Sequence, residues 1–232
     1  MSASKSPWSY NIMHEDLSEK LFDNQAIVVT EPIADYRHCL YQSELALVQD
    51  VSNKRMLEFS TGRDCAHQAL HQLGFETCPI LRGPQREPLW PERVVGSISH
   101  CRDLAGAVVA DKRMVDSVGL DIENIKPLNP GIARHVCTEE ERHWLMQLDE
   151  SQQNLALLLI FSLKEAVFKC VYQATRHALR FQQCRIIPAS ITDNIINTIS
   201  LPKSILINQE IRSCFFISNS PVYSGVYLPR QP

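Results

Sequence analysis

The sequence predicts an α+β fold made of two subdomains, and three observations lead to this prediction. Short apolar runs typical of strands alternate with longer stretches in which apolar residues recur every three or four positions. Each half of the chain holds a strand, then a helix, then further strands. Glycine and capping signals mark helix ends. We therefore expect subdomains at residues 1–112 and 113–232 that meet near residues 111–117.

The N-terminal half is expected to open with a strand and a long helix. Its first roughly 20 residues are polar, so we expect loose order there. AIVVT, residues 26–30, is typical of a strand. Residues 42–73 have a helical pattern, and Gly74 follows as a natural stop.

A loop and three strands are expected next. Residues 81–96 contain three prolines and two glycines, which favour an extended loop over a helix or a central strand. The strands are predicted at VVGSISH (94–100), LAGAVVA (104–110) and VGLDIE (118–123).

The C-terminal half is expected to hold two helices and a final set of strands. Thr138 and Glu141 form a capping box, which predicts a helix from about residue 139. A long helix is predicted over residues 151–172. The β-like runs that follow are CRIIPASI, ISLPKSILI, SCFFIS and VYSGVYL.

Composition restricts the class of protein. The chain has 232 residues, 44% hydrophobic and 21% charged, which fits a globular protein with a substantial core. Its net charge of −3 gives no global basic field, so a nucleic-acid partner is not expected. No signal peptide or transmembrane segment is recognisable, so a cytoplasmic location is expected. The eight cysteines show no zinc-ligand spacing and are expected to be reduced.

Two carboxylates share one face of the strand at residues 118–123. Asp121 and Glu123 are two positions apart, so their side chains point the same way. Adjacent carboxylates repel unless one is protonated or a cation lies between them, and hard oxygen ligands suit Mg²⁺. The alternative is an ordinary solvated strand end.

A third carboxylate lies within an apolar stripe of the long helix. Glu165 shares its face with Leu158, Phe161 and Phe168, so it is expected to lie away from solvent, where it needs a partner. Lys169 is one turn further on. A metal ion shared with Asp121 and Glu123 would supply that partner. The alternative is an ordinary surface ion pair between Glu165 and Lys169.

Basic residues are candidates for phosphate binding. Arg55 and Arg63 are eight positions apart, so they share one helix face, and Arg82 and Arg86 lie in the proline-rich loop. His100 ends a predicted strand. A solvated helix face and a structural histidine are the alternatives for these residues.

Taken together, five segments resemble the Sfp-type 4′-phosphopantetheinyl transferases, and most closely the branch typified by enterobactin synthase component D. They span roughly the middle half of the chain and follow the order of that family. The matching segments are EFSTGRDCAHQAL (58–70), RGPQREPLWP (82–91), GSISHC (96–101), GLDIE (119–123) and FSLKEAVFK (161–169).

The resemblance implies a pseudo-dimer of two similar α+β subdomains with the active site between them. It implies transfer of 4′-phosphopantetheine from coenzyme A to a serine of an apo carrier protein, with Mg²⁺, or Mn²⁺ instead, as cofactor and release of adenosine 3′,5′-bisphosphate. The carrier would belong to fatty acid, polyketide or nonribosomal peptide synthesis, siderophores included. A monomer is the simplest expectation.

The resemblance also assigns residues. Asp121, Glu123 and Glu165 match the metal-binding acids, and Lys169 matches a lysine on the pyrophosphate. Glu165 is the candidate general base, so Glu165 and Lys169 are the predicted catalytic residues. The residues expected to contact coenzyme A are Arg55, Arg63, Arg86, His100 and Lys169. Two other functions stay open, a metal-dependent phosphohydrolase or nuclease and a coenzyme A-binding module with a degenerate site.

Overall fold

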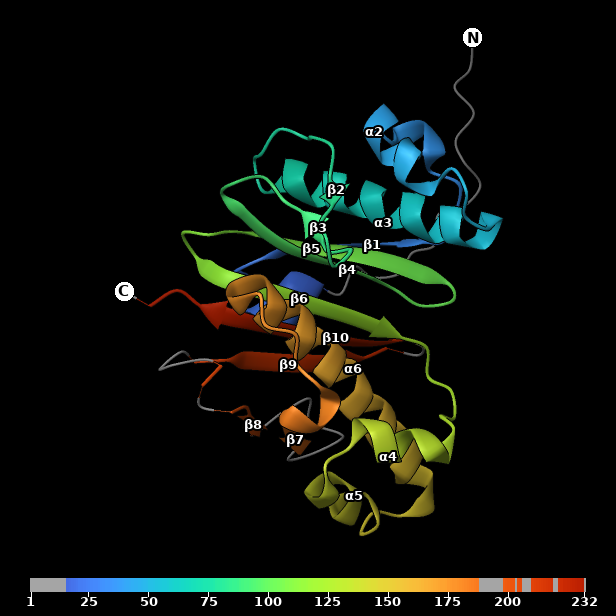
Figure 1. Cartoon of the computed structure of the whole chain (residues 1–232), viewed down its shortest axis with the longest axis vertical. Coiled ribbons are helices and arrows are strands. Elements are labelled where there is room, and N and C mark those ends of the chain that lie inside the picture. The colour runs from blue at the N-terminus through green and yellow to red at the C-terminus, as the bar shows by residue number, and fades with distance from the viewer. Residues whose placement is uncertain (1–15, 188–197, 203, 206–209, 219–220, 232) are drawn as a thin grey trace.

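Two three-stranded sheets, each covered by one long helix, make up the described fold (Figure 1). This computed structural model describes residues 16–187, 198–202, 204–205, 210–218 and 221–231. The predictions for residues 1–15 and for parts of CRIIPASI and ISLPKSILI lie outside these ranges. All eight cysteines are free thiols.

The N-terminal part runs from a short helix to a β-hairpin. After α1 (Leu17–Phe22), strand β1 (Ile27–Pro32) leads to α2 (Gln42–Leu45) and α3 (Asn53–Gln72). A short hairpin follows, whose strands β2 (Leu81–Arg82) and β3 (Pro88–Leu89) are two residues long each. Strands β4 (Val94–His100) and β5 (Leu104–Asp111) come next. In the described residues, β1, β5 and β4 form an antiparallel sheet in that order.

The C-terminal part repeats this plan. Strand β6 (Val115–Glu123) is followed by α4 (Ala133–Val136), α5 (Glu139–Leu145) and α6 (Glu150–Thr175). The short strands β7 (Arg185–Ile187) and β8 (Thr198–Ser200) pair with each other, and β9 (Arg212–Ile217) and β10 (Val222–Pro229) follow. The second antiparallel sheet has the order β6, β10, β9.

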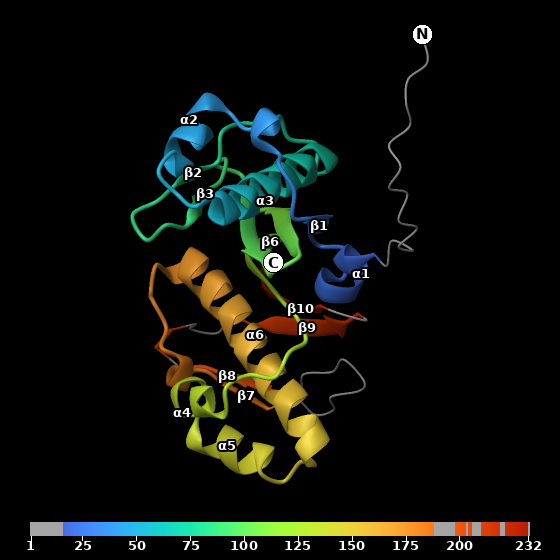
Figure 2. The same ribbon diagram turned by 90° about the vertical axis from the view of Figure 1, so that its right-hand side faces the viewer.

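Both sheets therefore have the same connectivity. In each, a first strand is followed by a long helix and then by a hairpin, and the last strand of the hairpin inserts next to the first strand. Helix α3 covers the first sheet and α6 covers the second, as the two views show (Figures 1 and 2). The prediction of an α+β pseudo-dimer is confirmed. The boundary between residues 112 and 113 stays a prediction, although Lys112 lies in the turn between β5 and β6.

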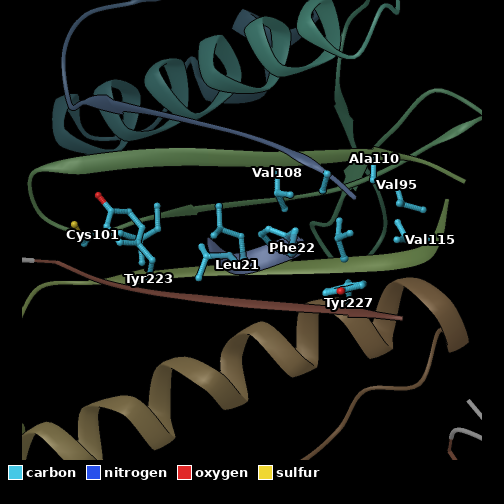
Figure 3. Close-up of a cluster of buried hydrophobic side chains, with 13 residues drawn as sticks. Leu21, Phe22, Val95, Cys101, Val108, Ala110, Val115, Tyr223 and Tyr227 are labelled. Carbon is cyan, nitrogen blue, oxygen red and sulfur yellow. The ribbon is translucent and has the colours of Figure 1, made fainter. Parts of the chain in front are cut away.

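One hydrophobic cluster lies between the sheets and joins them (Figure 3). Leu21 and Phe22 of α1 are buried in it, against Val108 of β5, Leu120 of β6 and residues of β10. Helix α1, which the sequence did not predict, thus packs against strands of both sheets. The long helix predicted over residues 42–73 is also divided, because the chain leaves the helical path before Ser52, which caps α3.

The side chain of Gln173, in α6, also links the two sheets. Gln173 donates its amide Nε2–H to Gly96 O of β4, at 2.8 Å, and accepts the Val118 N–H of β6, at 3.2 Å. Strands β4 and β6 are edge strands of their sheets, so these two backbone groups have no ladder partner there. The Gln173 side chain therefore takes the place of a hydrogen bond between strands, and it holds β4 and β6 at a fixed distance from each other.

Gly119 lets α6 lie close against β6. A Cβ at this position would be 1.9 Å from Ala166 O, which belongs to the backbone of α6 and cannot rotate away. Gly119→Ala is therefore expected to push α6 off the sheet and to lower the free energy of unfolding by about 1–3 kcal/mol. Urea denaturation measures this change.

The matched control is Gly131→Ala. A Cβ there would meet only the side chain of Asn129, at 3.2 Å, so the midpoint of unfolding should change little. Equal midpoints for the two variants would contradict the close approach of α6 to β6.

Candidate active site

A cavity of about 320 Å³ lies where the two halves meet, and six of its lining residues are basic. We call it the basic cavity. Its basic residues come from α3, the β2–β3 hairpin, β4 and α6: Arg55, Arg63, Arg82, Arg86, His100 and Lys169. Two acids, Glu58 and Asp121, also line it. The site is thus built for an anion, although the chain as a whole is acidic.

All five residues predicted to contact coenzyme A line this cavity. The helical spacing of Arg55 and Arg63 places both on the face of α3 that borders it. Arg86 reaches it from the turn of the hairpin, in a left-handed conformation with φ of 68°. Arg82 also lines the cavity, and the prediction had not chosen it from the basic residues of the same loop.

Arg63 is the most deeply buried of these arginines. Its side chain is 7% exposed, and its Nε–H has no hydrogen-bond partner. Burial lowers the pKa of Arg63 to about 10, and the Glu44 carboxylate, 3.8 Å away, opposes this shift. The guanidinium therefore stays charged at neutral pH. A buried charge with an unpartnered donor at a cavity wall fits an anion that binds there.

Lys169 and Asp121 of the C-terminal half are hydrogen-bonded to Ser99 of the N-terminal half at the wall of the basic cavity. Lys169 Nζ donates to Asp121 Oδ1 at 2.9 Å, to Ser99 Oγ at 3.0 Å and to Leu120 O at 2.8 Å. Ser99 Oγ in turn donates to Asp121 Oδ1 at 3.0 Å. All three ammonium donors are therefore used within the protein, and a ligand that binds Lys169 must replace at least one of these bonds.

The nearby lysines do not fully compensate the negative charge of the three predicted metal ligands. Burial, and then the charge of Asp121, raises the pKa of Glu123 to about 7. Burial also raises the pKa of Glu165, against the lowering effect of Lys169. Asp121 Oδ2 is buried and has no hydrogen-bond partner.

These features fit a divalent cation held by Asp121, Glu123 and Glu165, because a cation would stabilise all three ionised carboxylates and satisfy Oδ2. Their side chains do not converge as ligands in the structure. In residues 16–187 and the later described segments, no three acidic, histidine or cysteine side chains are grouped in that way. Asp121 points to Lys169 instead. The metal site stays a prediction.

Glu165 does not lie on the face of α6 that packs into the core. That face carries Leu159, Leu163 and Val167, all fully buried. Glu165 is only partly buried, and its neighbour Phe168 lines a second cavity. Within the predicted stripe, Phe168 borders a cavity whereas Leu158 is buried in the core, so the prediction of a carboxylate facing away from solvent is only partly correct.

The fully buried charge of α6 is Lys164, which the sequence reasoning missed. Its ammonium donates to Glu141 Oε2 at 2.6 Å, to Val136 O at 2.8 Å and to Phe181 O at 3.0 Å. Both side chains of the ion pair are 0% exposed. Lys164 thus anchors the α4–α5 region and the turn at Phe181 to the helix that carries Glu165 and Lys169.

The second cavity, of about 550 Å³, adjoins the basic cavity. The two share the lining residues Arg86, Pro88, Ile98 and Lys169. The walls of this second cavity include the aromatic and aliphatic side chains of Trp90, Phe168, Tyr172 and Leu179, together with charged residues such as Lys112 and Asp116. The site as a whole therefore has a strongly basic end and a more apolar end of mixed charge, with Lys169 between them.

Comparison with known proteins assigns both halves. Residues 43–110 match the family model for the 4′-phosphopantetheinyl transferase N-terminal domain, and residues 117–217 match that for the 4′-phosphopantetheinyl transferase superfamily. Together these two matches cover most of the chain and contain every predicted site residue.

Curated relatives agree with this assignment. The chain is 38% identical over 148 residues to 4′-phosphopantetheinyl transferase Svp of Streptomyces mobaraensis, over 63% of this chain and 60% of Svp. It is 36% identical over 143 residues to 4′-phosphopantetheinyl transferase PptT of Mycobacterium tuberculosis, over 62% of this chain and 63% of PptT. With enterobactin synthase component D of Salmonella typhimurium it shares 37% identity over 124 residues, 53% of this chain and 50% of the relative.

The chain thus spans only 60% and 63% of the length of the first two relatives. Among solved structures, a holo-(acyl-carrier-protein) synthase from Bacillus anthracis, in complex with CoA (3′,5′-ADP), matches with a TM-score of 0.40 and 17% identity. That match covers 51% of this chain and 99% of the synthase.

Proposed function

The chain belongs to the 4′-phosphopantetheinyl transferase superfamily, and on this premise we propose that it transfers the 4′-phosphopantetheine arm of coenzyme A to a serine of an apo carrier protein. In the proposed reaction the serine oxygen forms a bond to the phosphorus next to pantetheine. The bond from that phosphorus to the bridging oxygen breaks, and adenosine 3′,5′-bisphosphate leaves.

The observation that carries the proposal is the basic cavity at the junction of the two halves. Coenzyme A is rich in phosphate at its nucleotide end and has a long, uncharged arm at the other end. The six basic residues match the first part, and the aromatic and aliphatic walls of the adjoining cavity offer room beside Lys169 for the second. Lys169 lies between the two cavities, where the pyrophosphate of such a ligand would lie.

In this proposal the chain's own side chains bind and orient the anion. Arg63 offers an unpartnered buried donor, and Arg55, Arg82 and Arg86 add charge around it. Lys169 stabilises the charge that develops on the leaving phosphate. Tight placement of both reactants accounts for much of the rate of phosphoryl transfer.

Glu165 is the proposed acceptor of the serine proton. Glu165 lies one helical turn from Lys169, so its carboxylate is close to the position proposed for the pyrophosphate. When bound at Asp121, Glu123 and Glu165, Mg²⁺ would supply positive charge that offsets the pyrophosphate.

The carrier in this proposal belongs to a fatty acid, polyketide or nonribosomal peptide synthase. The similarity to enterobactin synthase component D favours a carrier of siderophore synthesis among these. In the described residues, no helix is long and apolar enough to cross a membrane.

The test is chromatographic measurement of adenosine 3′,5′-bisphosphate from coenzyme A. We expect its release with Mg²⁺ and an apo carrier, loss of release when EDTA is added, and recovery when Mg²⁺ is restored in excess. A carrier whose target serine is replaced by alanine is the control. Equal release with this control carrier would contradict transfer and indicate a phosphohydrolase.

A further inference from the structure

Arg55 and His100 form a hydrogen bond inside the basic cavity, and a phosphate bound there would compete for Arg55. Arg55 Nη1 is 2.7 Å from His100 Nε2. An arginine side chain can only donate hydrogen bonds, so Nε2 must accept and carries no proton. His100 is therefore neutral in the free protein. Burial and the positive charges of Arg55 and Lys169 also lower the pKa of His100, and the negative charge of Glu58 opposes this shift.

The groups around His100 come from every element that borders the basic cavity. Helix α3 contributes Arg55, Glu58 and Arg63, α6 contributes Lys169, β6 contributes Asp121, and the β2–β3 hairpin contributes two arginines, Arg82 and Arg86. Of these, only Glu58 is an acid close to the imidazole, with its Oε2 3.6 Å from Nε2. Glu58 also accepts from Arg55 Nη1 at 3.2 Å.

A cavity that only binds anions gains nothing from the negative charge of Glu58 in its wall. A carboxylate at this wall repels phosphate and weakens the field of Arg55. Its place is explained if His100 gains a positive charge when the anion is bound, because Glu58 then becomes the partner of an imidazolium. The same carboxylate keeps Arg55 in position while the cavity holds no anion.

We propose that a phosphate dianion entering the basic cavity draws Arg55 away from His100, and that His100 then takes up one proton from solvent at Nε2. The new N–H donates to the phosphate or to Glu58. This inference rests on the proposed phosphate role of the cavity. It makes phosphate binding and proton binding at His100 mutually supportive, so each strengthens the other.

The direction of the pH effect follows from this linkage. His100 is neutral in the free protein at pH 7, and the bound anion raises its pKa. Affinity for a dianion therefore increases as pH falls through the pKa of the bound state, and it stops increasing below the pKa of the free state. Carrier docking is not needed for this effect.

The test is an NMR titration of the histidine side chains with and without inorganic sulfate. Sulfate keeps both charges across the range of about pH 5 to pH 8, so its own protonation does not complicate the measurement. Loss of one resonance in His100→Gln assigns His100. We expect sulfate to raise the titration midpoint of His100 by about one unit or more.

His67 is an internal control on the same helix. It is bound to Glu44 and does not line the basic cavity, so its midpoint should not move. In Glu58→Gln, the rise at His100 should be smaller than in the wild-type protein. Calorimetry of sulfate binding near pH 7, in buffers of different ionisation enthalpy, gives an independent count of the protons taken up, and adenosine 3′,5′-bisphosphate is the second anion tested.

The outcomes separate the inference from the proposed function. Binding in the cavity with an unchanged His100 midpoint, or with equal shifts at His100 and His67, would overturn the proton uptake and leave the transferase proposal intact. No binding of either anion would count against both.

Discussion

Asp121→Asn is expected to lower kcat/KM for phosphopantetheine transfer by about 10³-fold or more. The substitution keeps the shape of the side chain but removes a buried charge that binds Lys169 and Ser99 and is a proposed ligand of the metal. A bound metal contributes several kcal/mol to stabilising charge in a transition state, and each 1.36 kcal/mol is worth a factor of about ten in rate. Steady-state kinetics with an apo carrier measures the change.

The matched control is Asp103→Asn. Asp103 lies in the exposed turn between β4 and β5, and its side chain is 66% exposed. We expect kinetics close to wild type for this variant. If Asp121→Asn turned over at the wild-type rate with a normal Mg²⁺ requirement, the proposed metal site would be wrong.

Lys164→Met is expected to lower the free energy of unfolding by about 3–5 kcal/mol. The substitution keeps most of the apolar stem but leaves the fully buried Glu141 without a counter-charge and two backbone carbonyls without a donor. Glu141 also accepts the backbone N–H groups of Thr138 and Ile186, so it cannot move to solvent without further loss. Urea denaturation followed by circular dichroism measures the effect.

A double substitution separates the charge from the packing. Glu141→Gln combined with Lys164→Met removes the unpaired charge, so the pair should be less destabilised than the sum of the two single variants. Lys126→Met, at an exposed position, is the surface control. Simple additivity in the double variant would show that Lys164 and Glu141 are not coupled.

Local sequence signals predicted the elements that carry the site. Strand β4 has the predicted bounds, and β6 contains the whole of the predicted strand, with Asp121 buried two residues before its end. The capping box at Thr138 is present, with reciprocal hydrogen bonds to Glu141. These predictions succeeded because each depends on neighbours within a few residues, where alternation and helical spacing are informative.

Features that depend on distant partners were missed. Helix α1 is too short for a period to be recognised, and its burial depends on strands that follow much later in the chain. Lys164 lies in an apolar helix, and its burial makes sense only with Glu141, 23 residues earlier. Helix α6 is apolar on both its core face and its cavity face, so periodicity alone could not show which face Glu165 occupies.

The same distinction between local and distant contacts holds for the candidate site. Spacing placed Arg55 and Arg63 on one face, and both line the basic cavity. The Arg55–His100 contact joins residues 45 positions apart, and sequence spacing holds no information on it. The sequence predicted side chains that line the basic cavity, while only the structure shows which of them contact one another.

The measurement that tests the central claim most directly is the intact mass of an apo carrier protein after incubation with this protein, coenzyme A and Mg²⁺. We expect the carrier to gain the mass of one phosphopantetheine arm, and we expect no gain with Asp121→Asn or with a carrier that lacks the target serine. A folded protein that binds coenzyme A but leaves nonribosomal peptide, polyketide and fatty acid carriers unmodified would contradict the proposed transferase function.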